Sequence, residues 1–128
     1  MLPPATPSAS PLPAVSEQEA RIKHLPVDAR AAFQLFRTGG DPTTLDPLIF
    51  AILEDFIPLA PAVPLSQQPG ATQLIEGLGF DSLSITEVVF FTEDLFGITI
   101  TNEEIIQVRT LDDLRGFIHR KVAVRGKR

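Results

Sequence analysis

The 128-residue chain is long enough for one small domain with extensions, and its 44% hydrophobic and 21% charged residues are ordinary for a globular protein. It contains no cysteine, which excludes disulfides and thiolate chemistry, and its two histidines, His24 and His119, lie too far apart in sequence to suggest a metal site. Residues 41–116 hold thirteen acidic and two basic side chains. The net charge of -5 therefore conceals an acidic centre, which repels nucleic acid and either attracts basic protein surfaces or simply aids solubility.

The N-terminal residues 1–15, "MLPPATPSASPLPAV", are rich in proline, serine and alanine, and we expect a disordered arm. They lack a basic leader, and no apolar run in the chain approaches the ~18 residues of a transmembrane helix. We therefore expect no signal peptide, no membrane insertion and a cytoplasmic location.

Residues 16–40 form a predicted N-terminal helical extension. Ser16 and Glu19 have the spacing of a capping box, which predicts a first helix. Pro26 opens a second helical stretch, and the glycine pair 39–40 closes it. From the sequence, these two helices either dock on the main domain or stay mobile.

The main domain, predicted over residues 41–121, begins with a helix over residues 44–57. The apolar residues that repeat there at helical spacing are Leu45, Leu48, Ile49, Ile52 and Phe56. Asp46 and Pro47 offer an alternative start, as N-cap and first helical residue. Residues 58–77 contain four prolines and make an unusually long loop, which either has a role or conceals a short helical turn near "TQLIE".

Three further helices follow. "DSLSITEVVFFTEDLF" is capped by Asp81 and ends before a glycine, and an extended "ITI" comes after it. Thr101 with Glu104 and Thr110 with Asp113 have capping-box spacing, which predicts a short third helix and the final helix "TLDDLRGFIHRKVAV". The chain order predicts an all-α fold, a four-helix antiparallel bundle with one long crossover.

The helix from residue 82 to residue 96 has two apolar faces. The stripe expected to face the core is Ile85, Val88, Val89, Thr92, Leu95 and Phe96. Leu83 and Phe90 lie seven residues apart on a different face. The acidic residues near them are Glu87, Glu93 and Asp94. An apolar pair among carboxylates is typical of a partner-binding face, although the loop or the N-terminal helices are alternative covers for it.

Ser82 stands in the first turn of this helix. The unsatisfied amides and positive dipole there favour an anion attached to its hydroxyl, and Gly79 allows a tight turn just before it. A plain capping serine and a kinase site are alternatives. A hydrolase nucleophile with His119 as its base is a third, but Phe80 and Ser84 stand where a G-x-S-x-G elbow has glycines.

Residues 73–118, with "LIEGLG", "DSL", "TEDLFGITI" and "TNEEI" in this order, resemble the acyl carrier proteins. With the helix over residues 44–57, the resemblance covers the whole acidic domain. It implies that Ser82 of the motif Asp81-Ser82-Leu83 carries a 4′-phosphopantetheine arm, attached by a phosphopantetheinyl transferase that uses coenzyme A. It also implies a carrier and not an enzyme, with no catalytic residue of its own.

By the same resemblance, the protein holds acyl intermediates as thioesters and delivers them to acyl-transferring and ketosynthase-type enzymes of fatty-acid, lipid or polyketide biosynthesis. The acids Glu87, Glu93 and Asp94 are expected to meet basic docking patches on these enzymes. The apolar centre of that contact is expected at Leu83, Thr86 and Phe90. A carrier that visits several enzymes is most simply a monomer. The alternative is a four-helix interaction module that uses this face and is never modified.

Some features depart from the family's pattern. Ser84 stands where aspartate is common and Leu95 replaces the last of three acids, which predicts a narrower set of partners. Phe80, in place of a second glycine, makes the chain nearer to free-standing carriers of fatty-acid type than to peptidyl carriers. Residues 122–128 are a predicted basic tail. Arg120 and Lys121, just before this tail, suit the C-terminus of a helix.

The interior of the bundle has two possible uses. A space lined by Val88, Val89, Thr92, Phe96 and residues of the first and fourth helices either shelters an acyl chain or is simply a packed core.

Overall fold

A computed structural model describes residues 15–126, and these residues are helical apart from their connections. In chain order the elements are α1 (Val15–Ile22), α2 (Val27–Gly39), the 3₁₀ turn η1 (Pro42–Leu45), α3 (Asp46–Phe56), the 3₁₀ turn η2 (Leu65–Gln67), α4 (Ser82–Phe96), α5 (Asn102–Ile105) and α6 (Leu111–Gly126). Within this range the only strand-like pairing is an isolated bridge between Gln73 and Thr110. The expected all-α, carrier-like order of helices is confirmed.

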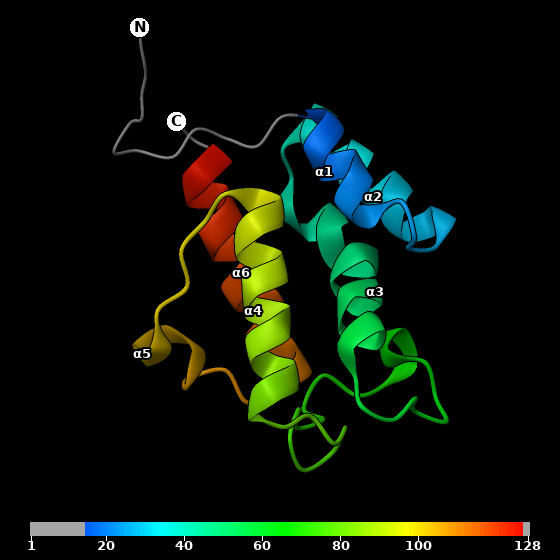
Figure 1. The fold of residues 1–128 in the computed structure, drawn as a ribbon, viewed down its shortest axis with the longest axis vertical. Coiled ribbons are helices and arrows are strands. Elements are labelled where there is room, and N and C mark those ends of the chain that lie inside the picture. The colour runs from blue at the N-terminus through cyan, green and yellow to red at the C-terminus, as the bar shows by residue number, and fades with distance from the viewer. Residues whose placement is uncertain (1–14, 127–128) are drawn as a thin grey trace, which may run out of the picture.

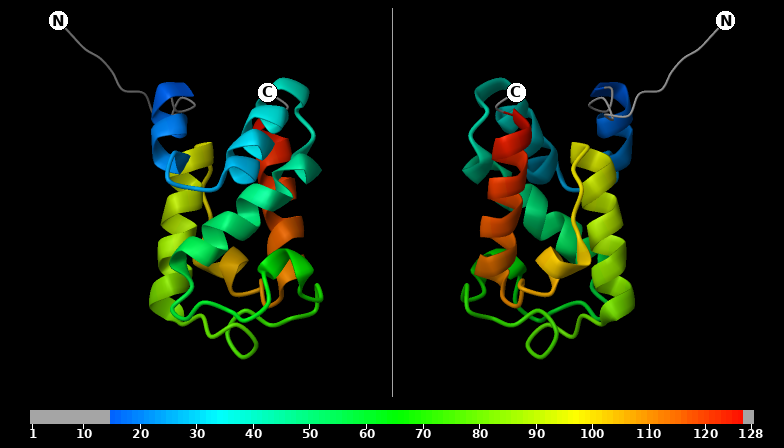
Figure 2. Two further views of the ribbon diagram at one scale, coloured as in Figure 1. Left: turned by 90° about the vertical axis from the view of Figure 1, so that its right-hand side faces the viewer. Right: turned by 90° about the vertical axis from the view of Figure 1, so that its left-hand side faces the viewer.

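The bundle is built from α3, α4 and α6, with the short α5 at its edge (Figure 1). Helix α3 runs opposite to the other two, whereas α4 and α6 run in the same direction because the link through α5 returns the chain to the lower end (Figure 2). The helices α1 and α2 cover the upper end, where α4 finishes and α3 starts. The loop between α3 and α4 closes the lower end.

Local side-chain chemistry sets the helix boundaries. The Asp41 carboxylate accepts a hydrogen bond from the Thr43 amide at 3.0 Å, which forms η1 and delays the start of α3 to Asp46. The helix thus starts one residue before the later of the two predicted starts, because Leu45 and not Asp46 is the N-cap. Helix α2 ends where Gly40 takes a left-handed φ of 77°, as its glycines predict. Helix α1 begins at Val15, so Ser16 lies inside the helix and does not precede it.

Both predicted capping boxes at the later helices are present. The Glu104 amide donates to Thr101 Oγ1 at 3.1 Å, and the Thr101 amide donates to Glu104 Oε1 at 3.0 Å. The Asp113 amide donates to Thr110 Oγ1 at 3.1 Å, and the Thr110 amide donates to Asp113 Oδ2 at 3.2 Å. Each box satisfies donors that a helix start would otherwise leave unpaired.

The long loop before α4 is anchored to the bundle. Leu65, Leu74 and Leu78 of this loop are buried, and a turn follows Gln73 as the sequence suggested. The Leu74 amide donates to the Arg109 carbonyl at 2.8 Å, and the Leu111 amide donates to the Thr72 carbonyl at 3.0 Å. The loop thus leads the chain along the lower end of the bundle to the start of α4.

The N-terminal helices share the core of the bundle. Phe33 of α2 is buried, with its ring centroid 6.2 Å from that of Phe96, and Phe36 approaches the same ring at 6.3 Å. Gln18 Nε2 of α1 donates to the Leu95 carbonyl at 2.9 Å. Of the two alternatives for this extension, docking is therefore the observed one.

Parts of the predicted termini lie outside the described residues. The predicted arm falls on residues 1–14, apart from Val15, and residues 127–128 of the predicted tail also lie outside this range. The preceding residues up to Gly126 belong to α6. Across the described range, no helix combines the length and apolar character that crossing a bilayer requires.

Candidate functional site

The candidate attachment residue, Ser82, is exposed at the first position of α4. Leu78 and Phe80 just before it are buried, and Gly79 between them has a φ of 84° that favours glycine. The Phe80 amide donates to the Leu74 carbonyl at 3.0 Å, which fixes the backbone of this approach. The buried side chains therefore hold the loop, and the serine two residues further on is left accessible.

Asp81 and Ser84 cap α4 reciprocally. The Ser84 amide donates to Asp81 Oδ1 at 2.8 Å, and the Asp81 amide donates to Ser84 Oγ at 3.0 Å. The Ser84 amide bond, followed by the bond from its hydroxyl, holds the pKa of the Asp81 carboxyl below its ordinary value of 3.8. Sequence reasoning identified Asp81 as the cap and missed Ser84, although two short polar residues three apart at a helix start were the available signal.

This cap changes the electrostatics expected at Ser82. One first-turn amide, that of Ser84, already faces an ionised carboxylate, because the Asp81 side chain accepts a hydrogen bond from it. A phosphate on Ser82 would therefore lie beside a negative charge that already occupies the Ser84 amide. The expected attraction of the helix start for an anion on Ser82 therefore excludes the Ser84 amide, which the Asp81 carboxylate already occupies.

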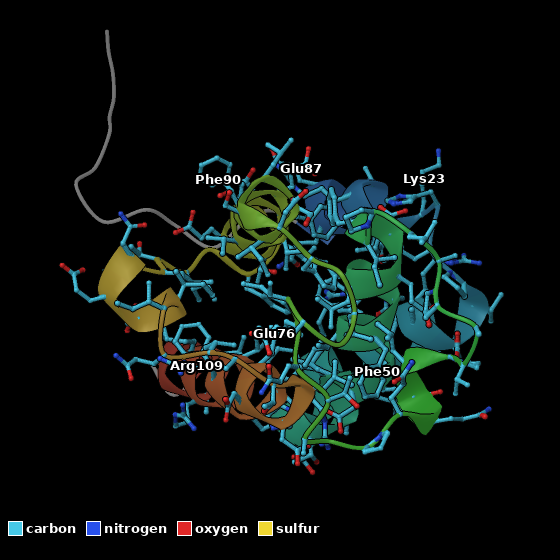
Figure 3. All side chains as sticks on the ribbon, turned by 90° about the horizontal axis from the view of Figure 1, so that it is seen from below. Lys23, Phe50, Glu76, Glu87, Phe90 and Arg109 are labelled. Atoms are coloured by element: carbon cyan, nitrogen blue, oxygen red, sulfur yellow. The ribbon has the colours of Figure 1, made fainter. Side chains whose placement is uncertain are left out.

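Four of the six residues predicted for the partner face are fully available. Leu83 and Phe90 are 68% and 61% exposed, and Thr86 and Glu87 are exposed as well. Glu87 and Phe90 point away from the bundle on the outer side of α4 (Figure 3). This N-terminal part of the face combines large exposed apolar side chains with one acid.

The other two predicted residues, Glu93 and Asp94, have interaction partners within the chain. Glu93 Oε2 accepts a hydrogen bond from the Ile100 amide at 2.7 Å and so fixes the link that leaves α4. Asp94 lies 3.6 Å from Arg21 of α1. Sequence reasoning missed Arg21 as a neighbour of this face, because the two residues are 73 positions apart and no local pattern joins them.

The interior contains a small cavity of about 20 Å³ between α3, α4, α5 and α6. Val88, Val89 and Thr92 line it as expected, together with Leu53 of α3 and Leu114 of α6. Phe96 does not line it, because its ring packs against Phe33 and Phe36 of α2. The expectation for Phe96 was wrong, because its stripe continues past the bundle into the contact with the extension.

His119 is not placed to serve Ser82 as a base. Its Nε2 lies 2.8 Å from Asp46 Oδ1, and Arg115 Nη2 lies 2.6 Å from the other oxygen of the same carboxylate. Asp46 starts α3 at the upper end of the bundle, whereas Ser82 starts α4 at the lower end (Figure 1). The structure does not bring a nucleophile and a base together here.

Comparison with known proteins points to one family. The family described as "Phosphopantetheine attachment site" matches residues 59–118. An acyl carrier protein of Solidesulfovibrio magneticus is 35% identical over 49 residues, which are 38% of this chain and 63% of that protein. The matched part is thus less than two thirds of that relative's length. No solved structure matches this chain.

Further relatives carry a more specific name. The meromycolate extension acyl carrier protein of Mycolicibacterium aurum is 29% identical over 72 residues, which are 56% of this chain and 74% of that protein. Its namesake in Mycobacterium tuberculosis is 29% identical over 79 residues, which are 62% of this chain and 68% of that protein. Over residues 59–118 the chain thus matches a family of phosphopantetheine attachment sites, and the relatives similar to this segment are acyl carrier proteins.

Proposed function

We propose that Ser82 carries the 4′-phosphopantetheine arm and that the protein holds acyl intermediates on it as thioesters. The single observation that supports this is the exposed hydroxyl at the first residue of α4, inside the segment that matches the attachment-site family. When bound, the arm supplies the thiol that this cysteine-free chain lacks. The relatives named for meromycolate extension favour enzymes that extend fatty acyl chains as the recipients.

The residues around Ser82 present the arm and do not hold it. Phe80 fixes the approach and the Asp81–Ser84 cap fixes the helix start, so a modifying transferase meets a rigid, accessible hydroxyl. The cap occupies the Ser84 amide, so this donor is not available to the phosphate. A mobile tether presents each acyl group to a docked enzyme at high effective concentration.

Partner enzymes are proposed to dock on the N-terminal part of α4. Leu83 and Phe90 supply an exposed apolar centre, and Glu87 supplies an accessible acid for basic residues of the partner. Charge complementarity of this kind accelerates association more than it adds affinity, which suits a shuttle. Glu93 and Asp94 contribute through the field they add, because both already have partners within the chain.

Intact mass tests the attachment. The purified protein is incubated with coenzyme A and a broad-specificity phosphopantetheinyl transferase, and we expect the mass of one phosphopantetheine to be added. Ser82→Ala should abolish the adduct and keep the helix content. Ser66→Ala, at an exposed serine of the loop before α4, is the matched control and should be modified normally. A folded wild-type protein that gains no mass would refute the proposal, and an adduct on Ser82→Ala would move the site elsewhere.

A further inference from the structure

Thr92 of α4 is a buried polar residue without a partner. It is 2% exposed, and its Oγ1 has no hydrogen-bond partner among residues 15–126. The other polar residue buried in this range is Ser84, whose hydroxyl is fully used by the cap of α4. Buried hydroxyls are almost always hydrogen-bonded, so Thr92 requires an explanation that Ser84 does not.

The surroundings of Thr92 are otherwise apolar. Twelve residues line the interior cavity, and Thr92 is the only one of them with a polar side chain. A second, narrower space lies between α3, α4 and α6, and Thr92 lines that space as well. Thr92 is therefore shared by the linings of the two spaces.

Water does not explain the hydroxyl well. A buried water needs two to four polar partners, and this cavity offers the side chain of one residue. Valine would fill the same volume without an unpaired polar atom, so packing alone does not explain a threonine here. An ionised ligand is excluded too, because apolar walls cannot compensate for the loss of its hydration. A neutral oxygen is the ligand chemistry that remains.

We propose that Thr92 Oγ1 binds a neutral oxygen substituent, a hydroxyl or a ketone, on the acyl chain carried by Ser82. This inference rests on the proposed function. It assigns to the core a preference for oxygenated chains, because a saturated chain beside Thr92 would leave the hydroxyl unpaired. Thr92 lies ten residues after Ser82, about 15 Å along the axis of α4.

The chain would enter by displacing side chains on the α5 side. The cavity of about 20 Å³ holds little more than one water, so a bound chain requires its walls to move. Helix α5 has four residues and none of them is buried, and Ile85, Val89 and Ile105 around the cavity are only half-buried. This wall has the least buried surface and yields at the lowest cost.

The test loads defined chains and measures their effect on stability. The phosphopantetheinyl transferase transfers octanoyl, 3-oxooctanoyl, 3-hydroxyoctanoyl and 7-hydroxyoctanoyl pantetheine from the corresponding coenzyme A thioesters, and intact mass confirms each product. In the wild type we expect at least one oxygenated chain to raise Tm about 3–5 °C further than octanoyl does, as one added hydrogen bond predicts. Thr92→Val should remove this difference, and Thr92→Ser should retain it.

Two further measurements separate the outcomes. Ile118→Val changes the volume of the same cavity without changing its polarity, so it should affect saturated and oxygenated chains alike. The second measurement uses the oxygenated chain that raises Tm most, labelled with ¹³C at its 3-oxo or hydroxyl-bearing carbon. The ¹³C chemical shift of that carbon should differ between the loaded wild type and loaded Thr92→Val. Loaded proteins whose ranking of chains is unchanged by Thr92→Val would overturn the inference. Failure of the wild type to take up any chain would instead overturn the proposed function.

Discussion

The guanidinium of Arg21 on α1 lies 3.6 Å from the carboxylate of Asp94 on α4, so a cation of the N-terminal extension rests against an acid expected to meet partner enzymes. Gln18 binds the Leu95 carbonyl next to it and fixes α1 at the same end of the helix. Both charged side chains are substantially exposed, so the pair adds little to stability. Its effect is electrostatic, because it lowers the negative potential that the C-terminal part of α4 presents.

Arg21→Glu should therefore strengthen the attraction of basic partners. We expect the kcat/KM of modification by a basic phosphopantetheinyl transferase to rise about two- to fivefold at low salt, and the rise should shrink as salt screens the charges. Lys23→Glu is the matched control, because it makes the same change in net charge at an exposed position on the same hairpin. Equal effects of the two substitutions would mean that net charge alone matters and that the contact with Asp94 does not.

The packing of Phe33 against Phe96 predicts that the extension unfolds together with the carrier domain. Phe33→Ala removes a fully buried ring and should cost about 3–4 kcal/mol, and Phe33→Leu should cost less. Leu35→Ala on the same helix changes an exposed side chain and should cost under about 0.5 kcal/mol. Urea unfolding followed by far-UV circular dichroism measures these values. Two separate transitions, with α1 and α2 melting first, would show that the extension is an independent unit.

The features predicted correctly from the sequence are the local ones. The boxes at Thr101 and Thr110 each join residues three positions apart, so their chemistry is visible in a short window. The stripe on α4 is similar, because helical spacing alone selects Val88, Thr92 and Leu95 for burial. The predicted boundary between the N-terminal extension and the main domain, at residue 40, does not follow from such a short-range pattern and stays a prediction.

The features missed depend on contacts between distant segments. Periodicity placed Phe96 on the same stripe as Val89, but whether α2 or the cavity meets that end of the stripe depends on where the extension docks. The same holds for Arg21, which has no sequence neighbour among the acids of α4. The capping role of Ser84 was missed for a different reason. Its spacing from Asp81 is a local signal, but Ser84 was interpreted only as the replacement of an aspartate that is common in the family.

Acid should destabilise the fold through its capping carboxylates. The groups whose pKa values lie below their ordinary values are Asp41, Asp81, Glu104 and Asp113, in each case mainly because they accept hydrogen bonds at helix or turn starts. A lowered folded-state pKa contributes stability above the unfolded value, and this contribution is lost as pH falls through the folded value.

The ordinary pKa values are 3.8 for the aspartates and 4.5 for the glutamate. The urea midpoint should therefore stay nearly constant from pH 7 to about pH 5 and fall below about pH 4. Asp113→Asn removes one contributing carboxylate and should flatten part of that fall. A midpoint that is unchanged at pH 3 would contradict this assignment.

The Asp46 carboxylate should matter for stability and not for attachment. It accepts hydrogen bonds from Arg115 and His119, and the hydrogen bond that Arg115 donates to Asp46 is the main reason that the pKa of Arg115 is raised. Asp46→Ala removes both acceptors, beside an Arg115 Nε that has no partner among the described residues, and should cost about 1–3 kcal/mol in urea unfolding. Asp46→Asn keeps one acceptor oxygen and should cost less. Because this cluster lies at the opposite end of the bundle from Ser82, the folded His119→Gln protein should be modified at the wild-type rate. A loss of modification there, with the fold intact, would reinstate His119 as a residue that acts on Ser82.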